Sequence, residues 1–228
     1  MRIKPFATRF HPPHEWDEGL AELRDRPASP YYKGVVPEYT PAALQDEVEI
    51  ERELDFLIGL KPRRTGMELE KIRDEEIGFE PAFEALLGLG AATPRTTELI
   101  VAVSEVTKYW TLQWKDRINR PRPYQLDDAI EPLFLPGHPA YPSGHGGQSH
   151  AVALALVAAT PARWHSPLRD LARDIGKRRE VAGVHYPSDT RSGILLAEAM
   201  IAALAAHPSQ VYPRQVEAAR AELASLLK

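Results

Sequence analysis

Apolar positions recur at helical spacing along most of the chain. Residues 41–60 have this spacing and predict a helix, with Thr40 as its N-cap and Pro41 as its first residue. The charged residues between the apolar ones predict a solvated face. Further helices are predicted near residues 81–89, 96–116, 143–159, 167–181, 188–206 and 210–227. No segment shows the alternation of a half-buried strand. The pattern therefore predicts an all-α bundle of roughly six to eight helices.

Prolines lie mainly between these helices. The first 41 residues contain seven of the 21 prolines and little periodicity, which predicts an irregular, proline-rich arm over residues 1–40. Residues 119–142 contain six prolines and predict a loop. Because 228 residues are enough for one well-buried core, we expect residues 41–228 to form a single helical domain.

Composition and charge narrow the class of protein. Hydrophobic residues make up 43% and charged residues 26%, as in folded globular proteins. A net charge of −4 argues against a nucleic-acid partner, and the absence of cysteine excludes disulfides and thiolate chemistry. The N-terminus lacks the apolar core of a signal peptide, and no apolar run approaches the roughly 20 residues of a membrane span. We therefore expect a soluble, cytoplasmic protein with no membrane span.

Three short segments carry candidate chemistry, and the first is basic. Lys115 and Arg122 stand seven residues apart, about two helical turns, so both side chains can reach one side of the molecule. Arg117 and Arg120 add positive charge between them. Clustered cations suit an anion, and arginine suits a tetrahedral oxyanion in particular. The structural alternative is a basic helix end that complements the helix dipole.

The second segment is the start of an apolar helix. Ser143 stands at the N-cap position, and Gly144 leaves its backbone N–H open to a ligand. A helix N-terminus with free amides binds anions, and His145 in the first turn would face the same anion. Alternatively, Ser143 is only a cap and His145 a surface residue.

The third segment combines Arg179, His185 and Asp189 at a junction between two predicted helices. A carboxylate bound to one ring nitrogen fixes the histidine tautomer and leaves the other nitrogen as a nucleophile or base. Asp189 alternatively serves only the helix N-terminus. A purely structural explanation of all three segments needs three separate coincidences, so we expect them to converge on one anion site.

In this order, Lys-x6-Arg-Pro, Pro-Ser-Gly-His and Arg-x5-His-x3-Asp resemble the motifs of the type 2 phosphatidic acid phosphatase (PAP2) superfamily. That superfamily includes soluble bacterial acid phosphatases, membrane lipid phosphatases and vanadium-dependent haloperoxidases. The resemblance spans residues 115–189, about a third of the chain. It implies a helical bundle of the PAP2/haloperoxidase type and a phosphatase without a metal cofactor. One departure is Arg178, which stands where the family usually has serine.

The resemblance also implies a role for each matching residue. His185 would attack phosphorus and form a phosphohistidine, and Asp189 would orient it. His145 would protonate the leaving oxygen and then activate water. The phosphate or vanadate oxygens would be bound by cations and helix-start donors: Lys115, Arg122, Ser143, Gly144 and Arg179.

The same superfamily contains two chemistries, because a pocket for phosphoryl transfer also binds vanadate. His138, seven residues before His145, is a candidate pocket residue that resembles some bromoperoxidases. The short chain and the third motif resemble the acid phosphatases. A phosphomonoester hydrolase is therefore the first hypothesis, a haloperoxidase with vanadate as cofactor the alternative, and a non-catalytic anion-binding module the third. We expect a small phosphate ester or an inorganic oxyanion as ligand; the natural substrate and any oligomer stay open.

Overall fold

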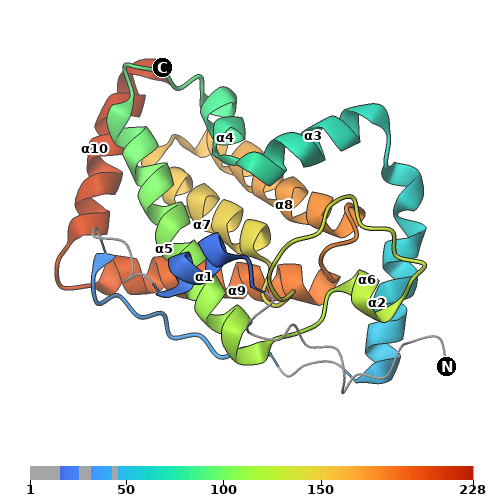
Figure 1. Ribbon diagram of the computed structural model, residues 1–228. Coiled ribbons are helices and arrows are strands. Elements are labelled where there is room, and N and C mark those ends of the chain that lie inside the picture. The colour runs from blue at the N-terminus through green and yellow to red at the C-terminus, as the bar shows by residue number, and fades with distance from the viewer. Residues whose placement is uncertain (1–15, 26–31, 43–45, 228) are drawn as a thin grey trace.

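Figure 1 shows a computed structural model of the chain, which describes residues 16–25, 32–42 and 46–227. These residues form helices and no strand, so the predicted all-α class is confirmed for them. The α-helices are α1 (Glu18–Asp25), α2 (Glu47–Gly59), α3 (Gly66–Ile77), α4 (Glu80–Leu87), α5 (Pro94–Ile118), α6 (Pro123–Leu126), α7 (Gly144–Ala159), α8 (His165–Val181), α9 (Pro187–Ala206) and α10 (Val211–Leu226). Two short 3-10 helices, η4 (Lys61–Arg63) and η5 (Ala162–Trp164), lie between them.

The centre of the molecule is α7, which packs against α5, α8, α9 and α10 (Figure 1). Its inner residues are small or aliphatic and fully buried, Ala151 and Leu156 among them. Gly147 and Gly193 allow α7 and α9 to approach closely. A Cβ on Gly147 would lie 2.9 Å from the Gly193 carbonyl oxygen, so a side chain there would push the helices apart. This close packing sets the start of α7 beside the start of α9.

Three features of the N-terminal half differ from the sequence-based predictions. Helix α2 begins at Glu47 rather than at Pro41, because Asp46 supplies the cap: its side chain accepts a hydrogen bond from Glu49 N at 2.9 Å. Helix α3 was not predicted, since its sequence is mostly charged and only two of its residues are buried. In addition, α1 lies within the predicted arm, of which residues 1–15 and 26–31 are outside the described part.

Helices α2 and α3 lie on the side of the bundle where α8 ends and α9 begins (Figure 1). Hydrogen bonds join Glu53 of α2 to Ser188 of α9, and ion pairs join Glu75 of α3 to the end of α8. Among the described residues, no single helix is long and apolar enough to cross a membrane. Helices α9 and α10 together have the length and composition of a membrane span, but they are bent by 96° relative to each other.

Candidate active site

The predicted site residues meet at one cavity. It has a volume of about 310 Å³ and lies between α3, α4, α5, the start of α7, the end of α8 and the loops before α7 and α9. Seven of the nine candidates line its wall: Lys115, Arg122, His138, Gly144, His145, Arg179 and His185. The other two, Ser143 and Asp189, lie directly behind the wall and contact residues of the site. The three motif segments therefore converge, as the sequence predicts.

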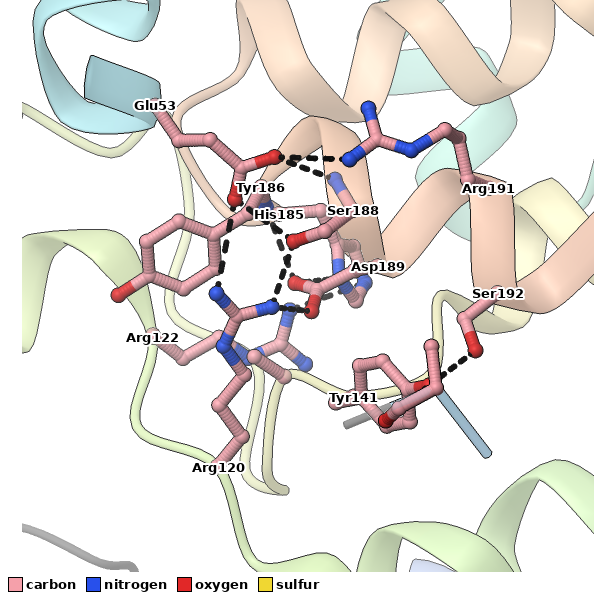
Figure 2. A network of polar contacts seen from close by, with 12 residues as sticks. Glu53, Arg120, Arg122, Tyr141, His185, Tyr186, Ser188, Asp189, Arg191 and Ser192 are labelled. Atoms are coloured by element: carbon pink, nitrogen blue, oxygen red, sulfur yellow. Dashed lines mark hydrogen bonds and ion pairs between the residues drawn. The ribbon is translucent and has the colours of Figure 1, made fainter. Parts of the chain in front are cut away.

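His185 and Asp189 form a buried pair (Figure 2). The His185 Nδ1 lies 3.1 Å from Asp189 Oδ2, and its Nε2 lies 3.0 Å from Arg122 Nη1. Because a guanidinium can only donate, Nε2 must accept, and the ring proton is on Nδ1. Burial, followed by the positive charges of Arg122 and Lys115, holds the pKa of His185 well below its ordinary value. His185, which lines the cavity, is therefore neutral, and Arg122 engages the lone pair of its Nε2.

Two basic side chains, Lys115 and Arg122, line the cavity together with His185. Lys115 Nζ donates to the carbonyl oxygens of Pro139 and Ala140 at 2.7 and 2.8 Å. Burial, followed by the charge of Arg122, lowers the pKa of Lys115 well below its ordinary value. Burial also lowers the pKa of Arg122 to about 10, which still leaves this group positive at neutral pH. A bound anion would favour the charged form of both groups.

Arg179 supplies the clearest sign of an anion site. Its Nη2 donates to the Ile72 carbonyl oxygen at 3.1 Å and to Glu75 Oε2 at 2.9 Å. Its Nε and Nη1 are buried and find no hydrogen-bond partner among the described residues. A buried donor without a partner costs about 1–3 kcal/mol, and more when it is charged. Since Arg179 lines the cavity, an oxyanion there would satisfy these donors.

The N-terminus of α7 completes the wall. Ser143 caps the helix, because its Oγ accepts a hydrogen bond from Gly146 N at 3.2 Å. Gly144 is the first helical residue and lines the cavity, so its backbone N–H is one of those without a partner inside the helix. A helix of 16 residues also directs its positive dipole end at this point. The predicted cap is therefore confirmed.

His145 lines the same cavity from the first turn of α7. Its Nε2 lies 2.8 Å from the Glu75 carbonyl oxygen, so Nε2 carries the proton and Nδ1 the lone pair of the neutral ring. Burial, followed by the positive charge of Arg179, lowers the pKa of His145 to about 3. The negative charge of a bound dianion would raise this pKa again.

His138 also lies at the wall. Its Nδ1 is 3.0 Å from Arg122 Nη2 and 3.1 Å from the Pro139 carbonyl oxygen. Burial, followed by the charges of Lys115 and Arg122, holds the pKa of His138 well below its ordinary value. This ring is thus a neutral neighbour of the cations and is not placed against His185 by any hydrogen bond.

Three charged residues outside the predicted set hold the site from behind. Glu75 binds Arg178 in addition to Arg179, with Arg178 Nε 2.7 and 2.9 Å from the two carboxylate oxygens. Arg120 and Glu53 contact the Asp189 side of the site (Figure 2). Arg120 stands out in sequence only as one of four clustered cations. Its neighbour Arg117 is exposed and lies over the Trp114 ring.

The departure at Arg178 now has a structural account. Where the family usually has a serine, this chain places a buried arginine that pairs with Glu75 of α3. Glu75 thereby carries two guanidinium groups, one of which faces the cavity. The expectation that residues 41–60 present only a solvated charged face is wrong for Glu53, which is 8% exposed.

In its described residues the protein is all-α, with a buried histidine–aspartate pair beside a cavity lined by Lys115, Arg122 and Arg179. A family model described as the PAP2 superfamily matches residues 97–211, which are 115 of the 228 residues. The chain belongs to the PAP2 superfamily.

Individual relatives agree with this membership. An acid phosphatase from Zymomonas mobilis subsp. mobilis (strain ATCC 31821 / ZM4 / CP4) is 34% identical over 116 residues, which are 48% of this chain and 42% of that protein. The aligned part thus spans less than half of that relative's length.

Two solved structures share the fold. A transmembrane PAP2 type phosphatidylglycerolphosphate phosphatase from Bacillus subtilis superposes with a TM-score of 0.52 at 16% identity, over 70% of this chain and 85% of that chain. A bacterial vanadium dependant iodoperoxidase gives a TM-score of 0.54 at 18% identity, over 88% of this chain and 62% of that chain. At these identities the likeness concerns the fold alone.

Proposed function

We propose that this protein is a phosphomonoester hydrolase that acts through a phosphohistidine on His185 and needs no metal cofactor. The observation that carries the proposal is that two residues with complementary properties line one cavity: the neutral His185, and Arg179 with its unpartnered Nε and Nη1. A nucleophile and charged donors at one cavity suit the transfer of a phosphoryl group. The similarity to an acid phosphatase supports the same activity.

Binding of the phosphate group would use the fixed cations. Lys115 and Arg122 are oriented by backbone carbonyl oxygens, and Arg179 is oriented by Glu75. The Gly144 N–H adds a donor at the start of α7. Such preorganised donors stabilise the negative charge on the equatorial oxygens without rearrangement during the reaction. Ser143 would act by ordering this first turn through its cap.

Attack would begin when Arg122 Nη1 transfers its hydrogen bond from His185 Nε2 to a phosphate oxygen. The lone pair of Nε2 then forms the N–P bond while the bond from phosphorus to the alcohol oxygen breaks. The alcohol oxygen takes a proton from His145, which the bound dianion has charged. Asp189 accepts the Nδ1 hydrogen bond and stabilises the positive charge that develops on the ring of His185.

Hydrolysis of the intermediate would reverse these roles. His145 now takes a proton from water, the water oxygen bonds to phosphorus, and the N–P bond breaks. The electron pair of that bond returns to His185 Nε2, and phosphate leaves. In the described part of the chain, no group of three or more His, Cys, Asp or Glu side chains lies together as metal ligands would. The charge that a metal would supply is instead available from the three cations.

A haloperoxidase is the second candidate function, and His138 favours it. This histidine lies on the cavity wall beside Arg122, in a pocket whose unpartnered Arg179 donors also fit vanadate. Vanadate would be held by the same three cations, with His185 Nε2 as its ligand, and it supplies the activation of peroxide for halide oxidation. The fold of an iodoperoxidase is compatible with this second candidate.

The experiment that tests the proposal is hydrolysis of p-nitrophenyl phosphate in the presence of a chelator. We expect release of phosphate well above background, and its loss in His185→Ala. His207→Ala, a histidine outside the cavity, is the matched control and should retain the wild-type rate. If the wild type releases no phosphate from any small monoester, the proposal fails. Halogenation by the vanadate-loaded protein with peroxide and bromide would then support the second candidate.

A further inference from the structure

The carboxylate of Asp189 is held on both oxygens (Figure 2). Its Oδ2 accepts hydrogen bonds from His185 Nδ1 at 3.1 Å and from Tyr186 N at 3.0 Å. Its Oδ1 accepts a hydrogen bond from Arg120 Nη1 at 2.7 Å. The side chain of Asp189 is fully buried, so these partners decide its orientation. Arg120 is the one charged donor among these three groups, and it does not line the cavity.

Arg120 is itself fixed from several sides. It is 1% exposed, and its guanidinium lies over the ring of Tyr186 at 3.9 Å. Its Nη1 also donates to Ser188 Oγ at 2.8 Å, and its Nη2 lies 3.5 Å from Glu53 Oε2. The guanidinium is thus shared between two carboxylates, one next to the reacting histidine and one on α2.

Glu53 links this arrangement to the N-terminus of α9. Ser188 N donates to Glu53 Oε1 at 2.8 Å, and Ser188 Oγ donates to Glu53 Oε2 at 2.6 Å. Ser188 lies in the first turn of α9, one residue before Asp189. Glu53 therefore holds the turn that carries Asp189 and, at the same time, the guanidinium that binds it. Glu53 lies outside the residues matched by the family model.

We propose that Arg120 and Glu53 are positioning residues for the His185–Asp189 pair, an inference that rests on the proposed function. Arg120 occupies Asp189 Oδ1, so that Oδ2 stays directed at His185 Nδ1. Without this hydrogen bond only Tyr186 N and His185 Nδ1 still hold the carboxylate, so the acceptor for the Nδ1 proton is less firmly directed and the tautomer depends mainly on Arg122. The nucleophilic Nε2 would then lose its lone pair in part of the molecules, which lowers kcat more than it weakens substrate binding.

A purely structural role for the same ion pairs makes a different prediction. Buried charges that only stabilise the fold would lower the melting temperature when removed, but leave the turnover of each folded molecule unchanged. The test must therefore measure kcat and KM on folded protein, and it must include a signal from the ring of His185.

The first experiment compares Arg120→Gln with Arg173→Gln. Arg173 is an exposed arginine that pairs with Asp170 on α8 and serves as the matched control. We expect Arg120→Gln to lower kcat for p-nitrophenyl phosphate by about 10- to 100-fold with less than about a threefold change in KM. The control should change neither value. Wild-type kcat in folded Arg120→Gln would overturn the inference.

A double-mutant cycle tests whether Arg120 acts through Asp189. In the Asp189→Asn background, the additional change Arg120→Gln should reduce kcat by less than about threefold, because the group it orients is already altered. Full additivity of the two losses would contradict the proposed route. Arg120→Lys keeps one charged donor and should recover part of the lost kcat.

Two further measurements keep the inference testable if Arg120→Gln does not fold. Glu53→Gln is nearly isosteric, keeps an acceptor for Ser188 N, and should lower kcat by about three- to tenfold. In protein with 15N-labelled histidine, NMR should find the His185 proton on Nδ1 in the wild type and a tautomer mixture in Glu53→Gln and Arg120→Gln. Unchanged tautomer and kcat in both variants would overturn the inference. Absence of hydrolysis in the wild type would instead overturn the proposed function, and the NMR comparison would still decide the positioning role.

Discussion

Two glutamates from the N-terminal helices approach the site from different sides and do different work. Glu53 of α2 lies behind the His185–Asp189 pair and contacts Arg120 and Ser188, which lie next to Asp189. Glu75 of α3 contacts a cavity-lining cation directly and binds His145 through its backbone carbonyl. Helix α2 therefore contacts the proposed nucleophile, His185, only indirectly, through Arg120, Ser188 and Asp189. Helix α3 directly contacts Arg179 and the proposed acid, His145.

The difference indicates that separate parts of this chain provide the site residues and the residues that hold them in place. The groups that would touch the substrate come from the residues matched by the family model, 97–211. Both glutamates lie outside that range. In the proposed mechanism the motif segments supply the reacting groups, and the preceding helices supply countercharges that fix their geometry. We expect the loss of Glu75, which contacts site residues directly, to lower activity more than the loss of Glu53, which acts through intermediate residues.

The largest expected effect is at Glu75. Glu75→Gln removes the countercharge of Arg178 and Arg179, both of which are buried. We expect the free energy of unfolding to fall by about 3–5 kcal/mol, because a buried charge loses its partner. The value of kcat/KM should fall by about 100-fold, more than in Glu53→Gln. Denaturant unfolding and steady-state kinetics measure both, and equal losses in the two variants would remove the distinction between the helices.

The second expected effect is a pH dependence of the free energy of unfolding, caused by His145, which Glu75 contacts. The pKa of His145 is lowered from 6.5 to about 3 by burial and by Arg179. The unfolded chain therefore binds a proton below pH 6.5 that the folded protein does not, so stability is full above pH 6.5 and falls towards pH 3. The contribution is up to about 1.4 kcal/mol per pH unit.

Urea unfolding at a series of pH values between 7 and 4 measures this slope. His145→Gln should make the slope shallower, because one titrating group is removed. His207→Ala is again the matched control and should leave the slope as in the wild type. A slope that does not change in His145→Gln would show that His145 is not held neutral in the folded protein.

The smallest expected effect is at Arg178. Arg178→Ser restores the residue usual in the family and leaves Glu75 paired with Arg179 alone. Since Glu75 keeps one partner, we expect a loss of about 1–2 kcal/mol in the free energy of unfolding. We also expect a change in kcat below about threefold, as Arg178 does not line the cavity. A collapse of activity would place Arg178 in the reaction rather than behind it.

The motif residues were predictable because their signals are local. Ser143 at a helix start and the spacing from His185 to Asp189 are features of a few consecutive residues, and the structure has them together at the cavity. The bundle class followed from helical spacing of apolar residues for the same reason. The placement of these residues is thus confirmed, whereas their catalytic roles stay predictions that the activity measurements test.

The supporting residues were not predictable because their partners are distant in sequence. Glu53 stands in a charged run and finds Ser188 135 positions later. Glu75 lies in the polar helix α3 and meets Arg178 103 positions later. In each case an acidic residue on a polar segment is expected to face water, and only the packing of that segment against the ends of α8 and α9 buries it.

The hydrogen bond from Arg122 to His185 has a consequence for selectivity. It engages the lone pair of Nε2, so in the proposed mechanism this nitrogen can attack only after Arg122 has moved its hydrogen bond to the substrate. In that mechanism a negatively charged ester would draw the Arg122 guanidinium away from Nε2, whereas a neutral carboxylic ester has no charge with which to do so. Recognition of charge and release of the nucleophile would then be a single event, and an uncharged ester in the cavity would meet a histidine whose lone pair is still engaged by Arg122.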